Sequence, residues 1–198
     1  EGSPTYASAE IDTIERFVRD GGGLLILAET EQSKYGNSLV DIAARFGIDI
    51  RNATVQDSVA RFREVATWPL IEPVTDPRWD PWAGVRAACV YRSGVLAPAT
   101  TDSDEDEVVV FGRSSSTAAP PHAPLLAAAL AGHGRVVVAA DSDIFGDDSI
   151  ADLDNRRLWL NLVTWSVAGA ALPRPRADDD VLADEVDFEI EDFNRRVI

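Results

Sequence analysis

Residues 9–30, AEIDTIERFVRDGGGLLILAET, carry the pattern of one helix, one tight turn and one buried strand. Ser8 stands where its hydroxyl can cap the helix, and three glycines after the helix allow a stop and a reversal of the chain. The run LLIL is apolar without alternation, which is typical of a strand covered on both faces. We therefore expect residues 24–27 in the middle of a parallel sheet between helices. The helix face is formed by the residues with helical spacing, Ile11, Ile14, Phe17 and Val18.

Outside this stretch, further segments have the periodicity of a helix or a strand, among them weaker strand candidates at residues 48–55, 95–99 and 108–111. Their lengths and flanking glycines and prolines separate the two types. Helices are expected at residues 38–46 and 155–168, a strand at residues 87–92, and a pair of strands at residues 125–130 and 135–140.

The chain divides into residues 1–170, which we expect to form one α/β domain, and an acidic tail at residues 171–198. In the tail, Val186, Phe188 and Ile190 alternate with acidic residues, so that in an extended chain they share one face. A segment of this kind can pair with the edge of a sheet and bind a partner. A solvated tail is the alternative.

Charge and composition exclude several classes of function. A net charge of -16 argues against binding to nucleic acid or to anionic membrane, both of which require basic surface. No apolar run is long enough to cross a bilayer. The single cysteine, Cys89, forms no internal disulfide and favours a reducing, cytoplasmic location. We therefore expect a protein partner or further domains of the same protein.

Three segments carry a family resemblance: ERFVRDGGGLLILAE, a helix that ends ARFGI, and GRVVVAADSDIF followed by a tryptophan-bearing helix. Together they resemble the class I glutamine-amidotransferase-like group. Within this group the likeness is to noncatalytic members, such as the GIFT domain of intraflagellar transport proteins and bacterial domains of unknown role. The resemblance implies a flavodoxin-like α/β fold, which is a doubly wound, mostly parallel sheet with helices on both faces. It also implies a first core strand upstream of residue 1.

In open sheets of this kind, ligands bind beyond the carboxyl ends of the strands. We therefore expect a ligand crevice where two strands end, formed by Glu29, Thr30, Asp141, Ser142 and Asp143. The resemblance places the catalytic cysteine of the enzymes in the loop at Glu29 and Thr30. It places their His-x-Glu pair in the loop from Asp141 to Asp143. Because neither is present here, the resemblance implies that glutaminase chemistry has been lost.

The same residues allow two other interpretations. Glu29 facing Asp141 or Asp143 could perform acid/base chemistry, or an arginine such as Arg92 or Arg113 could neutralise the carboxylates in a structural network. Cys89 lies in an apolar segment and is expected in the core.

A divalent cation is the one cofactor that the acidic residues suggest. The aspartates that partly match the spacing of a calcium loop are Asp141, Asp143, Asp147 and Asp152. The alternatives are that these aspartates cap backbone amides or are simply solvated. These alternatives are preferred, and under them no cofactor is expected.

The predicted function is a noncatalytic, amidotransferase-like binding or assembly module within a larger protein or complex. The alternatives are a carboxylate- or metal-dependent hydrolase and a small-molecule sensor, either of which would use the crevice. The noncatalytic prediction depends on residues 24–27 lying inside the sheet and on a cleft without a thiol and an imidazole.

Overall fold

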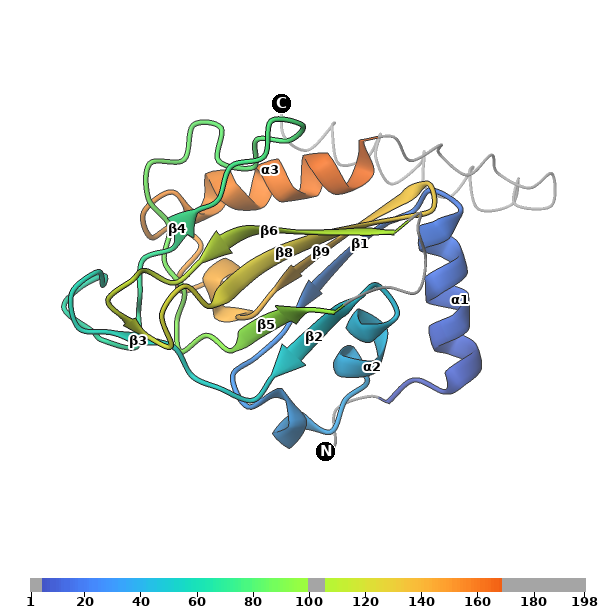
Figure 1. Cartoon of the computed structure of the whole chain (residues 1–198), viewed down its shortest axis with the longest axis horizontal. Coiled ribbons are helices and arrows are strands. Elements are labelled where there is room, and N and C mark those ends of the chain that lie inside the picture. Colours follow the sequence, from blue (N-terminus) through green and yellow to red (C-terminus); the bar gives the residue numbers. More distant parts are fainter. Residues whose placement is uncertain (1–4, 100–105, 169–198) are drawn as a thin grey trace, which may run out of the picture.

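The computed structural model describes residues 5–99 and 106–168, and its centre is a five-stranded mixed sheet (Figure 1). The strand order is β1-β9-β8-β6-β4. β1 pairs with β9 in parallel, whereas the other three pairings of this sheet are antiparallel. In sheet order, the strands are β1 (Gly23–Leu27), β9 (Gly134–Ala139), β8 (Pro124–Ala131), β6 (Glu107–Arg113) and β4 (Glu72–Pro73).

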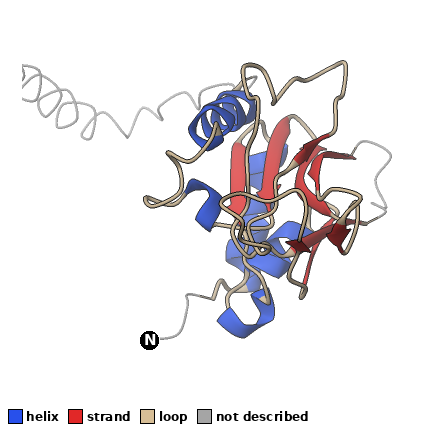
Figure 2. Ribbon diagram, turned by 90° about the vertical axis from the view of Figure 1, so that its left-hand side faces the viewer, coloured by secondary structure: helices blue, strands red, loops and turns tan. Residues whose placement is uncertain are grey.

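Helices and short ribbons cover both faces of this sheet, and Figure 2 shows these layers from the side. One hydrophobic core lies between the sheet and α1, α2 and the β2–β5 ribbon, and a second lies beneath α3. The helices are α1 (Ser8–Arg19), α2 (Leu39–Ala44) and α3 (Asn155–Val167), with 3₁₀ turns η1 (Gln32–Tyr35) and η2 (Asp143–Phe145). The antiparallel ribbons pair β2 (Ile48–Arg51) with β5 (Val95–Pro98), and β3 (Gln56–Asp57) with β7 (Ala118–Ala119). None of the helices among the described residues has the length and apolar character needed to span a membrane.

Several local predictions are confirmed. The opening stretch forms α1 and β1, and Gly21, at a φ of 114°, makes the turn between them. The two apolar runs at residues 125–130 and 135–140 form the β8–β9 hairpin. The cap of α1 differs from the prediction, because the amide of Ala7 donates to Glu10 Oε2 at 2.7 Å and Ser8 is the first helical residue.

The predicted flavodoxin-like fold, doubly wound and mostly parallel, is wrong. The first core strand expected upstream of residue 1 lies outside the described residues and stays a prediction. The described sheet is mostly antiparallel. The apolar run was misleading because an antiparallel strand covered on both faces has the same pattern. β8 is such a strand, buried from Leu125 to Ala129. The two-residue turn between β8 and β9 also permits only antiparallel pairing.

Two further positions differ from the prediction. β1 lies at the edge of the sheet rather than in its middle, since its one partner among the described strands is β9. Residues 87–92 do not form a strand of the sheet. They cross the structure as an irregular segment that is buried from Ala88 to Tyr91. Arg92 N donates to Thr67 O at 2.7 Å and Val90 N to Pro69 O at 3.2 Å, and Ala88 O accepts from Ile71 N at 2.9 Å.

Candidate functional site

The carboxyl ends of β1 and β9 bring the predicted crevice residues together. Because these two strands are parallel neighbours, Glu29 follows one and Asp141 follows the other at the same edge of the sheet. Carboxylate oxygens of Glu29, Asp141 and Asp143 all lie within 4.8 Å of one another. The Ser142 hydroxyl donates a hydrogen bond to Glu29 Oε1. We call these four residues the acidic crevice.

Asp141 is the buried member of the acidic crevice. Its Oδ2 accepts the Tyr91 amide at 2.5 Å, and its Oδ1 accepts the Asp143 amide at 3.0 Å. Burial raises the pKa of Asp141 to about 8, and although the two amide bonds oppose this shift, the neighbouring charges of Asp143 and Glu29 add to it. The carboxyl group therefore holds the strand end to the segment at residues 87–92.

The other crevice residues are also engaged. An Arg92 Nη2 lies 3.5 Å from Asp143 Oδ2, whereas Arg113, the other arginine considered above, pairs with Glu72 at 2.8 Å. Thr30 belongs to the predicted set but turns away, since its hydroxyl bonds Ala53 O at 3.0 Å. The carboxylates are thus partly neutralised by one arginine.

The aspartates with calcium-loop spacing do not gather around one point. Asp141 and Asp143 join Glu29, but Asp152 accepts hydrogen bonds from the Tyr91 hydroxyl and from Arg63, both at 2.8 Å. Asp147 is exposed. Because Asp152 is already paired with a cation and a hydroxyl, the calcium-loop spacing does not produce a four-aspartate site.

A hollow of about 750 Å³ borders the crevice at Asp143. Trp68, Tyr91 and Arg63 also line it. The sequence analysis did not identify these three residues, and we find no sequence signal that would have done so, because they come from irregular segments brought here by tertiary contacts. The hollow presents acidic groups, including the exposed Asp147 and Asp148, together with two arginines.

Cys89 is a core residue, as predicted. The thiol is fully buried and donates to the Tyr91 hydroxyl at 3.2 Å. Burial raises the pKa of Cys89 to about 11, which keeps the thiol protonated. His122 lies 3.7 Å from Glu72, and His133 lies in the β8–β9 turn, where its amide donates to Arg19 O at 3.0 Å. Within the described residues, the hydrogen-bond partner of the thiol is the Tyr91 hydroxyl.

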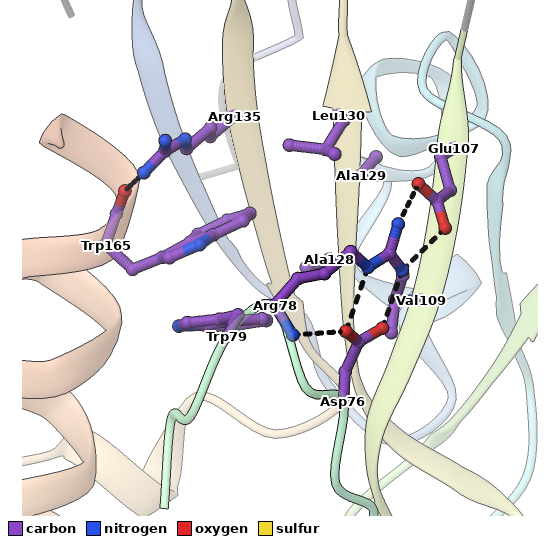
Figure 3. Close-up of a pocket in the computed structure, with 10 residues that line it drawn as sticks. All are labelled: Asp76, Arg78, Trp79, Glu107, Val109, Ala128, Ala129, Leu130, Arg135 and Trp165. Carbon is purple, nitrogen blue, oxygen red and sulfur yellow. Dashed lines mark hydrogen bonds and ion pairs between the residues drawn. The ribbon is translucent and has the colours of Figure 1, made fainter. Parts of the chain in front are cut away.

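A second, smaller hollow of about 140 Å³ lies between α3 and the sheet (Figure 3). Trp79 stacks on Trp165 with ring centroids 4.0 Å apart. Arg78 bridges Asp76 at 2.6 Å and Glu107 at 2.7 Å. These ion pairs use most of the charged groups in the hollow, so its remaining surface is largely apolar.

The fold and the site define a class of protein: an α/β domain with a mixed, mostly antiparallel sheet and an acidic crevice at the strand ends. The chain belongs to the family described as Domain of unknown function (DUF4350), whose model matches residues 1–163. A search of curated proteins finds no match.

Three solved structures share the fold. The chain is 17% identical to the mmIFT52 N-terminal domain, with a TM-score of 0.68, and the match covers 82% of this chain and 72% of that one. It is 13% identical to Cytoplasmic Protein STM1381 from Salmonella typhimurium LT2, with a TM-score of 0.54 and coverage of 79% and 60%. For Cytoplasmic Protein STM3548 from Salmonella typhimurium, the identity is 15%, the TM-score 0.52, and the coverage 79% and 59%.

These comparisons correct the family expectation. The family that matches is DUF4350, and the described sheet of this chain is mixed and mostly antiparallel. Membership in the glutamine-amidotransferase-like group and its flavodoxin-like description are therefore wrong for this chain. Similarity at such low sequence identity supports a shared fold and gives no information about activity.

Proposed function

We propose that this chain is a noncatalytic binding module that joins a protein partner in a larger protein or complex. The observation that carries the proposal is the outer edge of β1. The strand pairs with β9 on one side, and on its other side no strand of the described chain lies against it. Exposed strand edges present amides and carbonyls to which an extended segment of another polypeptide can bind.

The chemistry of the crevice supports a noncatalytic role. Asp141 is held by two backbone amides, Glu29 by Ser142, and the one thiol is buried and protonated. The noncatalytic prediction from the sequence assumed that residues 24–27 lie inside the sheet, whereas β1 is at the edge of the described sheet. The proposal therefore depends on the contacts of Asp141, Glu29 and Cys89 and on the edge of β1. A single free cysteine and the negative charge favour a cytoplasmic location without nucleic-acid partners.

An unbiased selection tests the proposal. The 198-residue chain is screened against a display library of random linear peptides, and amide hydrogen exchange is measured with each bound peptide. Ala28 N donates to Ala139 O on the β9 side of the strand, and backbone groups alternate between the two sides, so the amides of Leu25 and Leu27 face away from β9. We expect selected peptides to slow exchange at these two amides. Peptides that protect only the hollow beside Asp143, or no binding at all, would contradict the proposal.

A metal-dependent hydrolase is the second candidate, and the three clustered carboxylates are the observation that favours it. A ligand that binds only the folded state raises the Tm. Thermal melting with calcium or magnesium, on the chain and on Asp143→Asn, separates the two candidates. The binding-module proposal expects equal Tm values with and without the ion, whereas a rise that the substitution abolishes would favour the hydrolase.

The tail prediction lies outside the described residues. Val186, Phe188 and Ile190 remain a predicted partner-binding segment. Removing residues 177–198 and measuring partner recovery tests it, and unchanged recovery would contradict it.

A further inference from the structure

A third hollow, of about 480 Å³, lies on the outer face of α3. Leu158 and Leu162 are fully buried beneath this helix, whereas Leu160, two residues from each of them, is 48% exposed. The hollow lies on the exposed side, and its lining includes Leu153, Asp154, Arg156, Arg157 and Leu160. We call it the α3 groove.

The α3 groove has an excess of positive charge on a chain whose net charge is -16. Arg156 and Arg157 are exposed, and neither has a carboxylate partner within the residues that the structure describes. Asp154 already binds Arg86, through the side chain at 3.5 Å and through the amide at 2.9 Å. The hollow beside Asp143 and the hollow in Figure 3, in contrast, have at least as many carboxylates as guanidinium groups.

The position of these two arginines in α3 adds to the positive charge. Arg156 and Arg157 are the second and third residues of the helix, and its first turn contains no acidic residue. Because the N-terminal end of a helix carries a partial positive charge, carboxylates are stabilised there and guanidinium groups are not. A carboxylate in the α3 groove would therefore be attracted by both the side chains and the helix end.

Leu153 is an unusual residue for its position in the α3 groove. Its φ of 49° lies in the left-handed region, which glycine or asparagine adopts more readily than leucine. Its side chain is also 40% exposed. Neither the backbone conformation nor burial within the described chain accounts for a leucine here. A segment with apolar side chains in the α3 groove would bury Leu153 together with Leu160.

The chain's own tail has the composition that matches the α3 groove. Residues 177–193, ADDDVLADEVDFEIEDF, contain nine acidic and no basic residues, together with apolar residues such as Val186, Phe188 and Ile190. Carboxylates of this segment match the two unpaired arginines, and its apolar side chains match the exposed leucines.

The tail is also tethered close to the α3 groove. The helix ends at Val167, and at ~1.5 Å per residue Arg157 lies roughly 15 Å back along its axis. Residues 168–177 can span up to about 30 Å, so the acidic segment can reach the groove of its own chain. Tethering raises the effective concentration to the millimolar range, whereas a separate acidic protein would be repelled by the net negative charge.

We infer that residues 177–193 dock in the α3 groove of the same chain, with carboxylates at Arg156 and Arg157 and apolar side chains on Leu153 and Leu160. This contact goes beyond the proposed function. Because the docked range contains the predicted partner-binding residues of the tail, docking on α3 and binding of this segment to a partner exclude each other. A partner that takes the tail must first displace it from α3.

Nuclear magnetic resonance on the isotope-labelled 198-residue chain tests the inference. We expect nuclear Overhauser contacts between methyl groups of Leu153 or Leu160 and the side chains of residues 186–190. Arg156→Glu combined with Arg157→Glu should abolish these contacts. This variant should fold with an unchanged or higher Tm, since acidic residues are favoured in the first turn of a helix.

A matched control separates the effect of the groove from that of net charge. Arg16→Glu combined with Arg51→Glu makes the same change in net charge at two exposed arginines elsewhere. The contacts between the tail and α3 should persist in this control. Their loss in the control as well would show that net charge, rather than the groove, determines where the tail lies, and would overturn the inference.

Two further variants separate the apolar contact from the charge contact. Leu153→Asn should fold with an unchanged or higher Tm, because asparagine tolerates the left-handed conformation, and yet weaken the contacts of the tail. In the tail, Asp187→Arg combined with Glu189→Arg should release the segment. Adding Arg156→Glu and Arg157→Glu to that tail variant should restore the contacts, because the charges are then exchanged.

The other outcomes overturn the inference. A tail without contacts to α3, or contacts that survive the change of both groove arginines, means that the segment does not dock in the α3 groove. Contacts that depend on protein concentration mean that the tail of a second copy occupies the groove. None of these outcomes affects the peptide selection at β1, which hydrogen exchange at Leu25 and Leu27 tests separately.

Discussion

Asp141 connects three parts of the chain through one buried carboxyl group. It follows β9, accepts the amide of Tyr91 from the segment at residues 87–92, and lies beside Glu29 at the end of β1. For a buried carboxyl group without a cationic partner in direct contact, the protonated form has the lower free energy, because burial penalises the charged form. Its proton affinity therefore contributes to the stability of the fold.

We predict that this contribution appears in the pH dependence of stability. The pKa of Asp141 is about 8 in the folded chain, against 3.8 for an ordinary aspartate. Because the folded state holds the proton more tightly, the stabilisation is complete below about pH 4 and is lost as the pH rises through about 8. Urea unfolding from about pH 5 to about pH 8 should therefore show a steeper loss of stability in the unchanged chain than in Asp141→Asn. Parallel slopes would contradict the prediction.

At the scale of elements, the backbone at the start of β9 lies directly against the end of α1. A Cβ on Gly134 would lie 1.8 Å from Val18 O and 2.6 Å from Gly22 O, so a side chain there requires the helix end and the strand to separate. Gly36, in contrast, has a φ of 60° and no atom within 4 Å of such a Cβ.

These two glycines form a matched pair for mutation. We predict that Gly134→Ala lowers the free energy of unfolding by about 2–4 kcal/mol, because backbone atoms must move. Gly36→Ala should cost only about 1 kcal/mol, the strain of a left-handed alanine. Urea unfolding of both variants measures the difference, and equal losses would show that the close approach is absent in solution.

The two faces of α3 provide a second comparison. Leu162 is fully buried against the sheet, whereas Leu160 is 48% exposed. Leu162→Ala should lower the free energy of unfolding by about 2–5 kcal/mol through the cavity that it leaves, and Leu160→Ala by about 0.5 kcal/mol or less. Similar losses for both variants in denaturant unfolding would contradict the packing of α3 described here.

At the scale of the whole molecule, negative charge opposes compaction. The net charge is -16, and many of the arginine–carboxylate pairs, such as Arg51–Asp49 and Arg78–Glu107, are exposed at both partners. Exposed pairs contribute little, so screening should remove more repulsion than attraction.

We therefore predict that about 0.5 M NaCl raises the urea midpoint of unfolding. The double variant Asp147→Asn, Asp148→Asn removes two exposed charges beside the crevice. It should be more stable than the unchanged chain at low salt and should gain less from added salt. A midpoint that falls with salt would mean that the ion pairs outweigh the repulsion.

Local signals allowed several elements to be predicted. Helical spacing and glycine stops located α1 and α3, and two apolar runs around a short turn located the β8–β9 hairpin. The crevice residues Glu29, Asp141 and Asp143 were also predicted to lie together, and in the structure they do. The flavodoxin-like sheet was not correct, because a buried apolar run does not report strand direction.

The sequence by itself determined where α1, β1, the hairpin and α3 form, because periodicity and turn residues act over a few neighbouring positions. Only the tertiary structure decided that β1 lies at the edge of a mostly antiparallel sheet and that Tyr91 holds Asp141 across 50 residues of chain. Such pairings depend on which distant segments bury one another's surface and satisfy one another's hydrogen bonds. That information is not contained in any local pattern of the sequence.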